Sequence, residues 1–508
     1  MKTWMRATLA LAGGSVAFVF LTSLQTARPE ALQPYPLPFT SQIPGDINVK
    51  QLDAFNQKQQ FDQAQRMFDI FAWQAFVGLN WPALPNGQPD SSLKIGQSSP
   101  NGVVWESWKH DYQVFTANGQ PPLLSAIKNG KNSHAVVNTG NTLPDEIEEA
   151  LQAFTGPLVD KNGNWVTYEI RMSPREVDYV VGNNLYYVQG QVEFVNKGNT
   201  ISFPAGVYNG DIGAIEVKAA WRMLDPNTDD PSRYFTTTGD ISINDPSQFS
   251  KPLVKNNVLL GLVGFHISAK TQYARQWIWA TFEHVDNLEV PPLMYKGQRL
   301  MPSFYNPNNQ ILPVNVEPPQ NAVIPGQPIP SGQYYNSWDP TLTYQPTQAF
   351  RMIPIPTDKQ QLNREVQAAL AKLVPGNVFQ YYQLIDTQWP TDPAAPPTPT
   401  VPFDAGIFPN SVTNKAGGMV TPTYLTNITM ETYFQAGNQA AWHQIEGFPQ
   451  SETQQIYGTE SCTGCHSSAG VAIAYDPKQA LSSTNPLYGV PLTGDFSWLL
   501  QQKAQIRK

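Results

Sequence analysis

Residues 214–221 read AIEVKAAW, a stretch rich in β-branched and aromatic side chains that is typical of a β-strand. Residues 165–170 (WVTYEI), 185–188 (LYYV) and 259–267 (LLGLVGFHI) have the same character. Each of these segments predicts a further strand. We therefore expect the middle of the chain to form a sheet.

Helical patterns flank the predicted strands. Apolar residues recur at three- and four-residue spacing from Phe61 to Phe76, and Pro82 is expected to end that helix. Residues 359–373 predict one amphipathic helix, and residues 103–115 predict another helical stretch. Strands and helices together indicate an α+β fold.

Composition narrows both the architecture and the function. The chain has 508 residues, of which 46 are Pro, and Pro clusters at 288–345 and 390–402 predict irregular, Pro-rich loops. Only 14% of the residues are charged, and the net charge is −8. Nucleic-acid binding is not expected, because no basic block is present to contact a phosphate backbone.

The N-terminus is predicted to be an export signal. Lys2 and Arg6 precede an almost unbroken apolar run at residues 7–24, and Ala27 suits a cleavage site. Residues 1–27 are therefore interpreted as a signal peptide or, if they are retained, as an N-terminal membrane anchor. Either form predicts a protein of the periplasm.

The only two cysteines of the chain stand in one motif, Cys462-Thr463-Gly464-Cys465-His466. Covalent haem attachment needs two thiols for the two vinyl groups and an imidazole for the iron. In a helical turn Cys462 and Cys465 share one face, and His466 follows them. The motif predicts one covalent haem c, with Cys462 and Cys465 as thioether ligands and His466 as an axial iron ligand. In bacteria this attachment takes place outside the cytoplasm, in agreement with the export signal.

Two other uses of the cysteines remain open. A zinc site would need a fourth ligand, but the nearest upstream histidine is His443 and none lies downstream. A redox-active Cys462–Cys465 dithiol would favour a thioredoxin-like βαβ context, which this region lacks.

The motif resembles the haem-attachment motif of cytochrome c, and in particular the large single-haem cytochrome c-like proteins of bacterial envelopes. Three other phrases are similar to that group: WQAFVGLNWP at 73–82, EVKAAW at 216–221 and WIWATFEH at 277–284. The resemblance implies haem, iron and electron transfer to a redox partner protein, and it implies no substrate. The Pro-rich stretch 390–402 is the best linker candidate, so we expect residues 28–400 to form an α+β scaffold and residues 401–508 a haem c-binding region.

The sixth iron ligand is not evident from the sequence. The 42 residues after His466 contain neither Met nor His, so such a ligand must come from upstream. The candidates are Met430, Met419 and His443, and an open sixth position is the alternative. Met430 is expected to lie early in a helix that Asn427 caps.

Other histidines are expected to be structural. A helix is predicted from Lys270 to Asp286, after Ser268 as N-cap, and it would align Lys270, Tyr273, Trp277 and His284 on one stripe. Such a stripe could serve acid–base chemistry, although aromatic residues at helical spacing usually form core. His266 is expected to be a satisfied polar group of its strand, and His110 and His134 lie in no motif.

The predicted function is electron transfer by an exported mono-haem c-type cytochrome-like protein. The alternative is a haem-dependent enzyme of the peroxidase or oxygenase type with an open distal site. The chain length favours the enzyme, since about 80–100 residues can fold around one haem. A third interpretation is a binding protein whose haem senses redox state or a gas.

Overall fold

Strand β4 (Ile215–Met223) contains the stretch AIEVKAAW, and its side chains alternate between two environments. Val217 and Ala219 belong to the largest hydrophobic core. Glu216 and Lys218 line a cavity on the other side of the sheet. Successive side chains of a strand point to opposite faces, so β4 separates an apolar core from a polar cavity.

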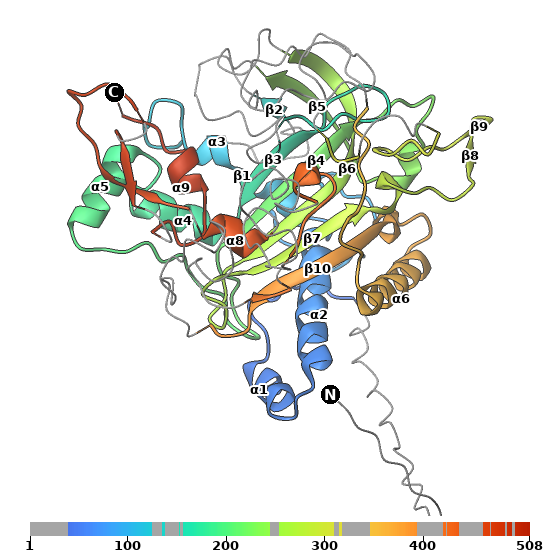
Figure 1. Ribbon diagram of the computed structural model, residues 1–508, viewed down its shortest axis with the longest axis horizontal. Helices are drawn as coiled ribbons and strands as arrows, with labels where there is room; N and C mark the ends of the chain where they lie inside the picture. The colour runs from blue at the N-terminus through green and yellow to red at the C-terminus, as the bar shows by residue number, and fades with distance from the viewer. Residues whose placement is uncertain are drawn as a thin grey trace, which may run out of the picture.

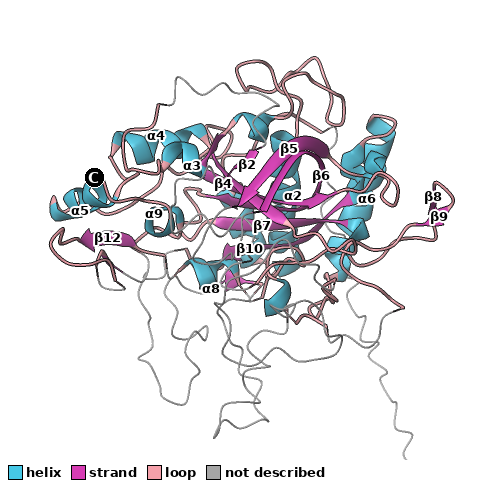
Figure 2. Ribbon diagram, turned by 90° about the horizontal axis from the view of Figure 1, so that it is seen from above, coloured by secondary structure: helices cyan, strands magenta, loops and turns pink. Residues whose placement is uncertain are grey.

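The computed structural model describes most of the chain and has an α+β fold (Figure 1). The described residues are 39–123, 135–137, 152, 156–243, 253–308, 314–316, 346–393, 420–422, 424–435, 461–467, 469–482, 485–489 and 493–507. The predicted signal segment 1–27 lies outside them. Among the described residues, helices pack around a nine-stranded mixed sheet (Figure 2).

The main sheet has the order β1-β3-β4-β6-β7-β10-β11, with β5 paired to β6 and β2 paired to β5. Its other strands are β1 (Lys109–His110), β2 (Ala135–Val137), β3 (Thr167–Met172), β5 (Thr236–Ile243), β6 (Leu253–Ala269), β7 (Ile278–His284), β10 (Tyr382–Pro390) and β11 (Val420–Thr421). All of these pairs are antiparallel except β2 with β5. Two short hairpins are formed by β8 (Met294–Tyr295) with β9 (Gln298–Arg299) and by β12 (Val471–Ala474) with β13 (Leu487–Gly489).

Two long helices, α2 (Phe61–Leu79) and α6 (Thr357–Leu373), cover the apolar face of the sheet. The other described helices are α1 (Val49–Gln57), α3 (Asp111–Val114), α4 (Pro174–Gly182), α5 (Val188–Asn196), α8 (Cys462–His466) and α9 (Leu499–Gln502). Helix α2 and helix α6 both pack against β10. Phe76 of α2 is fully buried, and its ring lies 4.4 Å from that of Phe282 and 5.7 Å from that of Phe265. This aromatic cluster joins the helix to the middle strands.

A buried lysine links the two helices to the sheet edge. The Lys359 ammonium of α6 lies 3.1 Å from Asp69 of α2 and 3.6 Å from Asp386 of β10. Asp358 supplies a third carboxylate at 2.8 Å. A cation so placed offsets the cost of burying the aspartates.

The C-terminal elements lie on the opposite side of the sheet from α2, where Figure 1 shows α8 in front of the strands. They share a second core with α4 and α5. Gln191 of α5 accepts from the Ala472 amide at 2.9 Å and donates to the Leu500 carbonyl at 2.7 Å. The described part of residues 401–508 is therefore joined to elements from the first half of the chain.

Several predicted elements are confirmed. The strands expected at 165–170, 214–221 and 259–267 are present as β3, β4 and β6, and the helices expected at 61–76 and 359–373 are α2 and α6. The strand expected at 185–188 is wrong, because this segment is a turn that leads into α5. The helical stretch expected at 103–115 is also wrong. It is divided into a 3-10 turn (Val104–Ser107), β1 and α3.

The helix expected from Lys270 to Asp286 is wrong as well. Residues 278–284 form β7, which pairs with β6 on one side and with β10 on the other. Trp277 has a left-handed backbone, with φ 64°, which no α-helix allows. The two partner strands complete the hydrogen bonds of β7, and this tertiary pairing outweighs the helical spacing of the aromatic residues. The stripe of Lys270, Tyr273, Trp277 and His284 does not form.

No helix in the described part of the chain is long and apolar enough to cross a membrane.

We predict that Phe76→Ala lowers the free energy of unfolding by about 3–5 kcal/mol, because it leaves a cavity within the aromatic cluster. Phe61→Ala on the same helix is the matched control, since Phe61 is 64% exposed, and its cost should stay within about 0.5 kcal/mol. Urea unfolding followed by tryptophan fluorescence measures both. Equal losses in the two variants would contradict the assignment of this core.

Candidate functional site

Helix α8 is one turn long and holds the motif Cys462-Thr463-Gly464-Cys465-His466. Ser461 is its N-cap, and the Ser461 hydroxyl accepts from the Gly464 amide at 3.3 Å. At the other end, the Ser467 hydroxyl donates to the Gly464 carbonyl at 2.8 Å. These caps satisfy backbone groups that so short a helix leaves open. The helical turn expected for the two cysteines is confirmed.

Gln388 of β10 attaches this helix to the sheet. The Gln388 side-chain oxygen accepts from the Ser461 hydroxyl at 3.0 Å and from the Thr463 amide at 2.8 Å. Its amide nitrogen donates to the Pro422 carbonyl at 2.6 Å. One buried side chain thus orients the start of α8.

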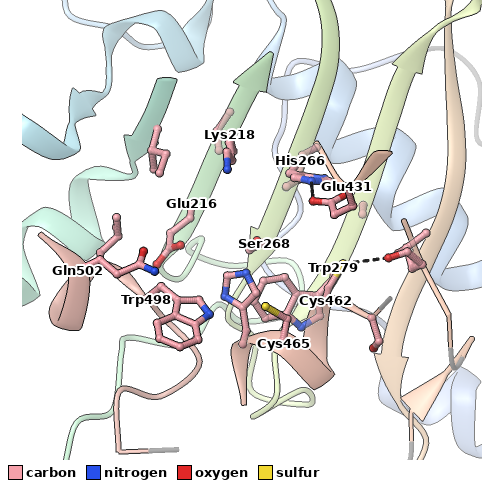
Figure 3. A pocket seen from close by; sticks show the side chains of 18 of the residues that line it. Glu216, Lys218, His266, Ser268, Trp279, Glu431, Cys462, Cys465, Trp498 and Gln502 are labelled. Atoms are coloured by element: carbon pink, nitrogen blue, oxygen red, sulfur yellow. Dashed lines mark hydrogen bonds and ion pairs between the residues drawn. The ribbon is translucent and has the colours of Figure 1, made fainter. Parts of the chain in front are cut away.

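Both cysteines and His466 line a single cavity beneath α8 (Figure 3). Its floor is the polar face of the sheet, where the register places Glu216, Ser268 and Trp279 in one cross-strand row. The cavity volume is about 120 Å³, and its mouth opens to solvent.

His466 is oriented for metal binding through one ring nitrogen. Nδ1 lies 2.8 Å from the Phe496 carbonyl oxygen, which can only accept, so Nδ1 carries the proton and donates. The Trp279 ring packs against the imidazole, with ring centroids 4.4 Å apart. Burial lowers the pKa of His466 to about 4, so the ring is neutral at pH 7. A neutral imidazole held through Nδ1–H presents Nε2 as the ligand atom.

Neither cysteine is part of a disulfide bond, and both are half-buried. Burial raises the pKa of Cys462 well above its usual value, and the Glu431 carboxylate and Cys465 raise it further. A reactive dithiol needs a lowered pKa, so this environment argues against a thioredoxin-like role. Among the described residues, no group of three or more His, Cys, Asp or Glu side chains could hold a metal ion.

The donor set fits a covalently bound haem. Two thiols and one neutral imidazole come from a single turn, and all three line the same cavity. Zinc would need a fourth protein ligand, but haem iron would not, because the four nitrogens of the porphyrin ring already hold it.

His266 and Glu431 form a hydrogen-bonded pair on another part of the cavity wall. His266 Nε2 lies 2.9 Å from a Glu431 carboxylate oxygen. Burial tends to raise the pKa of Glu431, but His266 and a hydrogen bond from the Asn427 amide outweigh burial and lower it. His266 was expected to be a satisfied polar group, and its Nε2 does have a hydrogen-bond partner. The sequence did not predict that His266 lines the cavity or that its partner is Glu431.

A second acidic group borders the cavity. Glu216 lines it, and the fully buried Glu176 of α4 forms a carboxyl pair with Glu216. Period-two alternation in β4 and β6 could have indicated this wall, because it places Glu216 and Lys218 on one face and antiparallel pairing adds His266 and Ser268.

Of the proposed sixth ligands, only Met430 lies among the described residues. Met430 is fully buried in a third hydrophobic core and does not line the cavity. It lies in a turn at residues 428–430, so the expected helix start is wrong, although Asn427 does accept from the Thr429 amide at 2.7 Å. Met419 and His443 lie outside the described residues.

The other candidate residues are separated from the cavity. His284 is fully buried, stacks on Tyr234 with ring centroids 4.0 Å apart, and its Nε2 donates to the Arg233 carbonyl at 2.9 Å. His110 is buried with its Nδ1 3.9 Å from Glu169. Neither histidine lines the cavity, which agrees with the structural role expected for His284, and His134 lies outside the described residues.

The remaining members of the expected stripe are also held by local contacts. The Lys270 ammonium pairs with Asp495 at 2.6 Å, and the Tyr273 hydroxyl donates to the Pro390 carbonyl at 3.1 Å. Neither residue lines the cavity.

Comparison with protein-family models, with curated proteins and with solved structures gives no match.

We predict that Gln388→Leu loosens α8. The change removes three hydrogen bonds, each worth about 0.5–1.5 kcal/mol, so amide hydrogen exchange at residues 463–467 should become at least about tenfold faster. Gln383→Leu on the same strand is the matched control, because Gln383 faces a different cleft. Unchanged exchange at α8 in Gln388→Leu would contradict the role given to this side chain.

Proposed function

We propose that this protein carries one covalent haem c and transfers electrons. The observation that supports the proposal best is the convergence of Cys462, Cys465 and His466 on one cavity, with His466 Nδ1 anchored to Phe496. The alternatives are less well supported, because the Cys462 pKa is raised rather than lowered and no metal-binding group is found among the described residues.

The residues of α8 have distinct tasks in this proposal. Cys462 and Cys465 would each hold the haem through one thioether, formed by addition of the thiol S–H across a vinyl double bond with no leaving group. His466 would bind the iron through Nε2, and the Phe496 carbonyl keeps the ring oriented and its other nitrogen protonated. The bound haem supplies a one-electron redox couple. Trp279 packs on the imidazole and excludes water from that side.

The proposed location is the periplasm, because haem c attachment follows export and residues 1–27 have the pattern of a signal peptide. A redox partner protein would exchange the electron. Contact with a membrane is proposed only for a form that keeps the N-terminal apolar segment.

A second candidate function is a haem-dependent redox enzyme of the peroxidase or oxygenase type. It is favoured by the His266–Glu431 pair in the cavity wall and by the position of Met430 outside the cavity. A hydrogen-bonded imidazole and carboxylate can hold or move a proton beside a bound substrate.

The first test is of attachment. We expect Cys462→Ala with Cys465→Ala to abolish haem that stays with the polypeptide on a denaturing gel. Thr463→Val is the matched control, since it keeps both thiols and Thr463 Oγ1 makes no hydrogen bond. Haem staining that survives in the double variant would overturn the proposal.

The second test separates the carrier from the enzyme. The enzyme requires that the reduced protein binds carbon monoxide readily and that His266→Leu shifts the infrared band of the bound carbon monoxide, which reports the polarity around it. Ser268→Ala, on the same face of β6, should leave that band in place. The carrier requires a filled sixth position and slow, weak binding of carbon monoxide. Met430→Ala should not change the spectrum in either case, because Met430 packs outside the cavity.

A further inference from the structure

Glu176 and Glu216 are two buried carboxyl groups at the edge of the haem cavity. Glu176 is fully buried, and Glu216 is 8% exposed and lines the cavity. Neither oxygen of Glu176 has a hydrogen-bond donor of good geometry, and Oε1 of Glu216 also lacks one. Unpartnered buried carboxylates are costly, so their arrangement needs a physical explanation.

The nearby lysines have other partners. Lys503 lies 3.2 Å from Asp111, and Lys270 lies 2.6 Å from Asp495. Lys218, next on the same face of β4, has its ammonium 5.1 Å from the centroid of the Tyr168 ring. No lysine, arginine or histidine in the described part of the chain forms an ion pair with Glu176 or Glu216.

The strand neighbours of Glu216 and its hydroxyl partner carry no positive charge. The cross-strand neighbours of Glu216 are Met172 on β3 and Ser268 on β6. The Ser497 hydroxyl is hydrogen-bonded to Glu216, and His466 of α8 is neutral at pH 7. Asp111 and Asp495 add negative potential from α3 and from the C-terminal loop.

The two carboxyl groups lie close enough to interact, because the Glu216 carboxylate raises the pKa of Glu176. Ionised carboxylates have only acceptors, so neither group can donate a hydrogen bond to the other unless one of them is protonated. Burial raises the pKa of Glu216 to about 7, and burial together with the Glu216 carboxylate raises the pKa of Glu176 well above its usual value. The pair therefore changes its proton content near neutral pH.

We propose that Glu176 and Glu216 form a proton-binding site whose occupancy is coupled to the redox state of the adjoining cavity. The inference rests on the proposed haem attachment and names a regulation of that same site. The pair takes up one proton from solvent when a one-electron donor reduces the cofactor, and it releases that proton on oxidation. One O–H bond forms, the electron enters the iron, and the net charge of the site is unchanged.

The physical basis is Coulombic. An added electron makes the cavity more negative, which stabilises the protonated form of a neighbouring acid. The low polarity around a buried pair screens this interaction less than water would. Linkage then requires that protonation of the pair favours the reduced state by the same factor.

The test is the reduction potential of the haem-loaded, exported protein between about pH 5 and pH 9. We expect the wild-type potential to fall by up to about 59 mV per pH unit near neutrality, the slope for one proton per electron. Glu176→Gln with Glu216→Gln should be flat there, because glutamine mimics the protonated acid in shape and charge. Glu193→Gln, at an exposed residue of α5, should keep the wild-type slope.

Infrared spectroscopy gives a second readout. The reduced-minus-oxidised spectrum of the wild type should contain a carbonyl band of a protonated carboxylic acid, which the double variant loses. If the double variant folds poorly, Glu216→Gln alone should move the sloping region to lower pH, since it removes the like charge beside Glu176.

The outcomes separate the two proposals. Protein without covalent haem would overturn the proposed function. Haem-loaded protein with a pH-independent potential, or with a slope that persists in the double variant, would overturn only the coupling to Glu176 and Glu216.

Discussion

The two-residue period of β4 and β6 is the constraint on which the rest of the molecule depends. One face of these strands contributes Val217, Ala219 and Phe265 to the core beneath α2. The other face carries Glu216 and His266, and antiparallel pairing brings such side chains into rows. A shift of one residue in register would exchange the two faces, placing charged groups in the core and apolar groups in the cavity. The core and the cavity wall are therefore consequences of the same pairing.

Helix α8 shows how the cavity depends on contacts that are distant in sequence. A helix of five residues cannot persist alone, because the first turn costs more conformational entropy than its few hydrogen bonds offset. Gln388, 75 residues before Thr463, binds the start of the helix. Phe496, 30 residues beyond His466, binds the imidazole at its end. The motif supplies the chemistry, and the sheet edge and the C-terminal loop set its orientation.

Buried charges are treated in two different ways in this fold. Arg222 lies 2.8 Å from Asp160 and 2.5 Å from Asp229, and Lys359 serves Asp69 and Asp386 in the same manner. Each of these clusters contains a cation, which offsets part of the cost of burying the carboxylates while they join elements together. Glu176 and Glu216 have no such cation, and in our proposal a bound proton takes its place.

The sequence by itself determined the α+β class, the helices at 61–76 and 359–373, and the grouping of Cys462, Cys465 and His466 in one motif. These features are local, since they follow from periodicity, composition and spacing within a few turns. It could not determine β7, where pairing with β6 and β10 overrides a helical pattern, or the exclusion of Met430 from the cavity. Nor could it find Glu431 or Glu176. Glu431 meets His266, and Glu176 meets Glu216, only through strand register and the packing of α4, because contacts between residues 40 or more positions apart are decided by the tertiary fold.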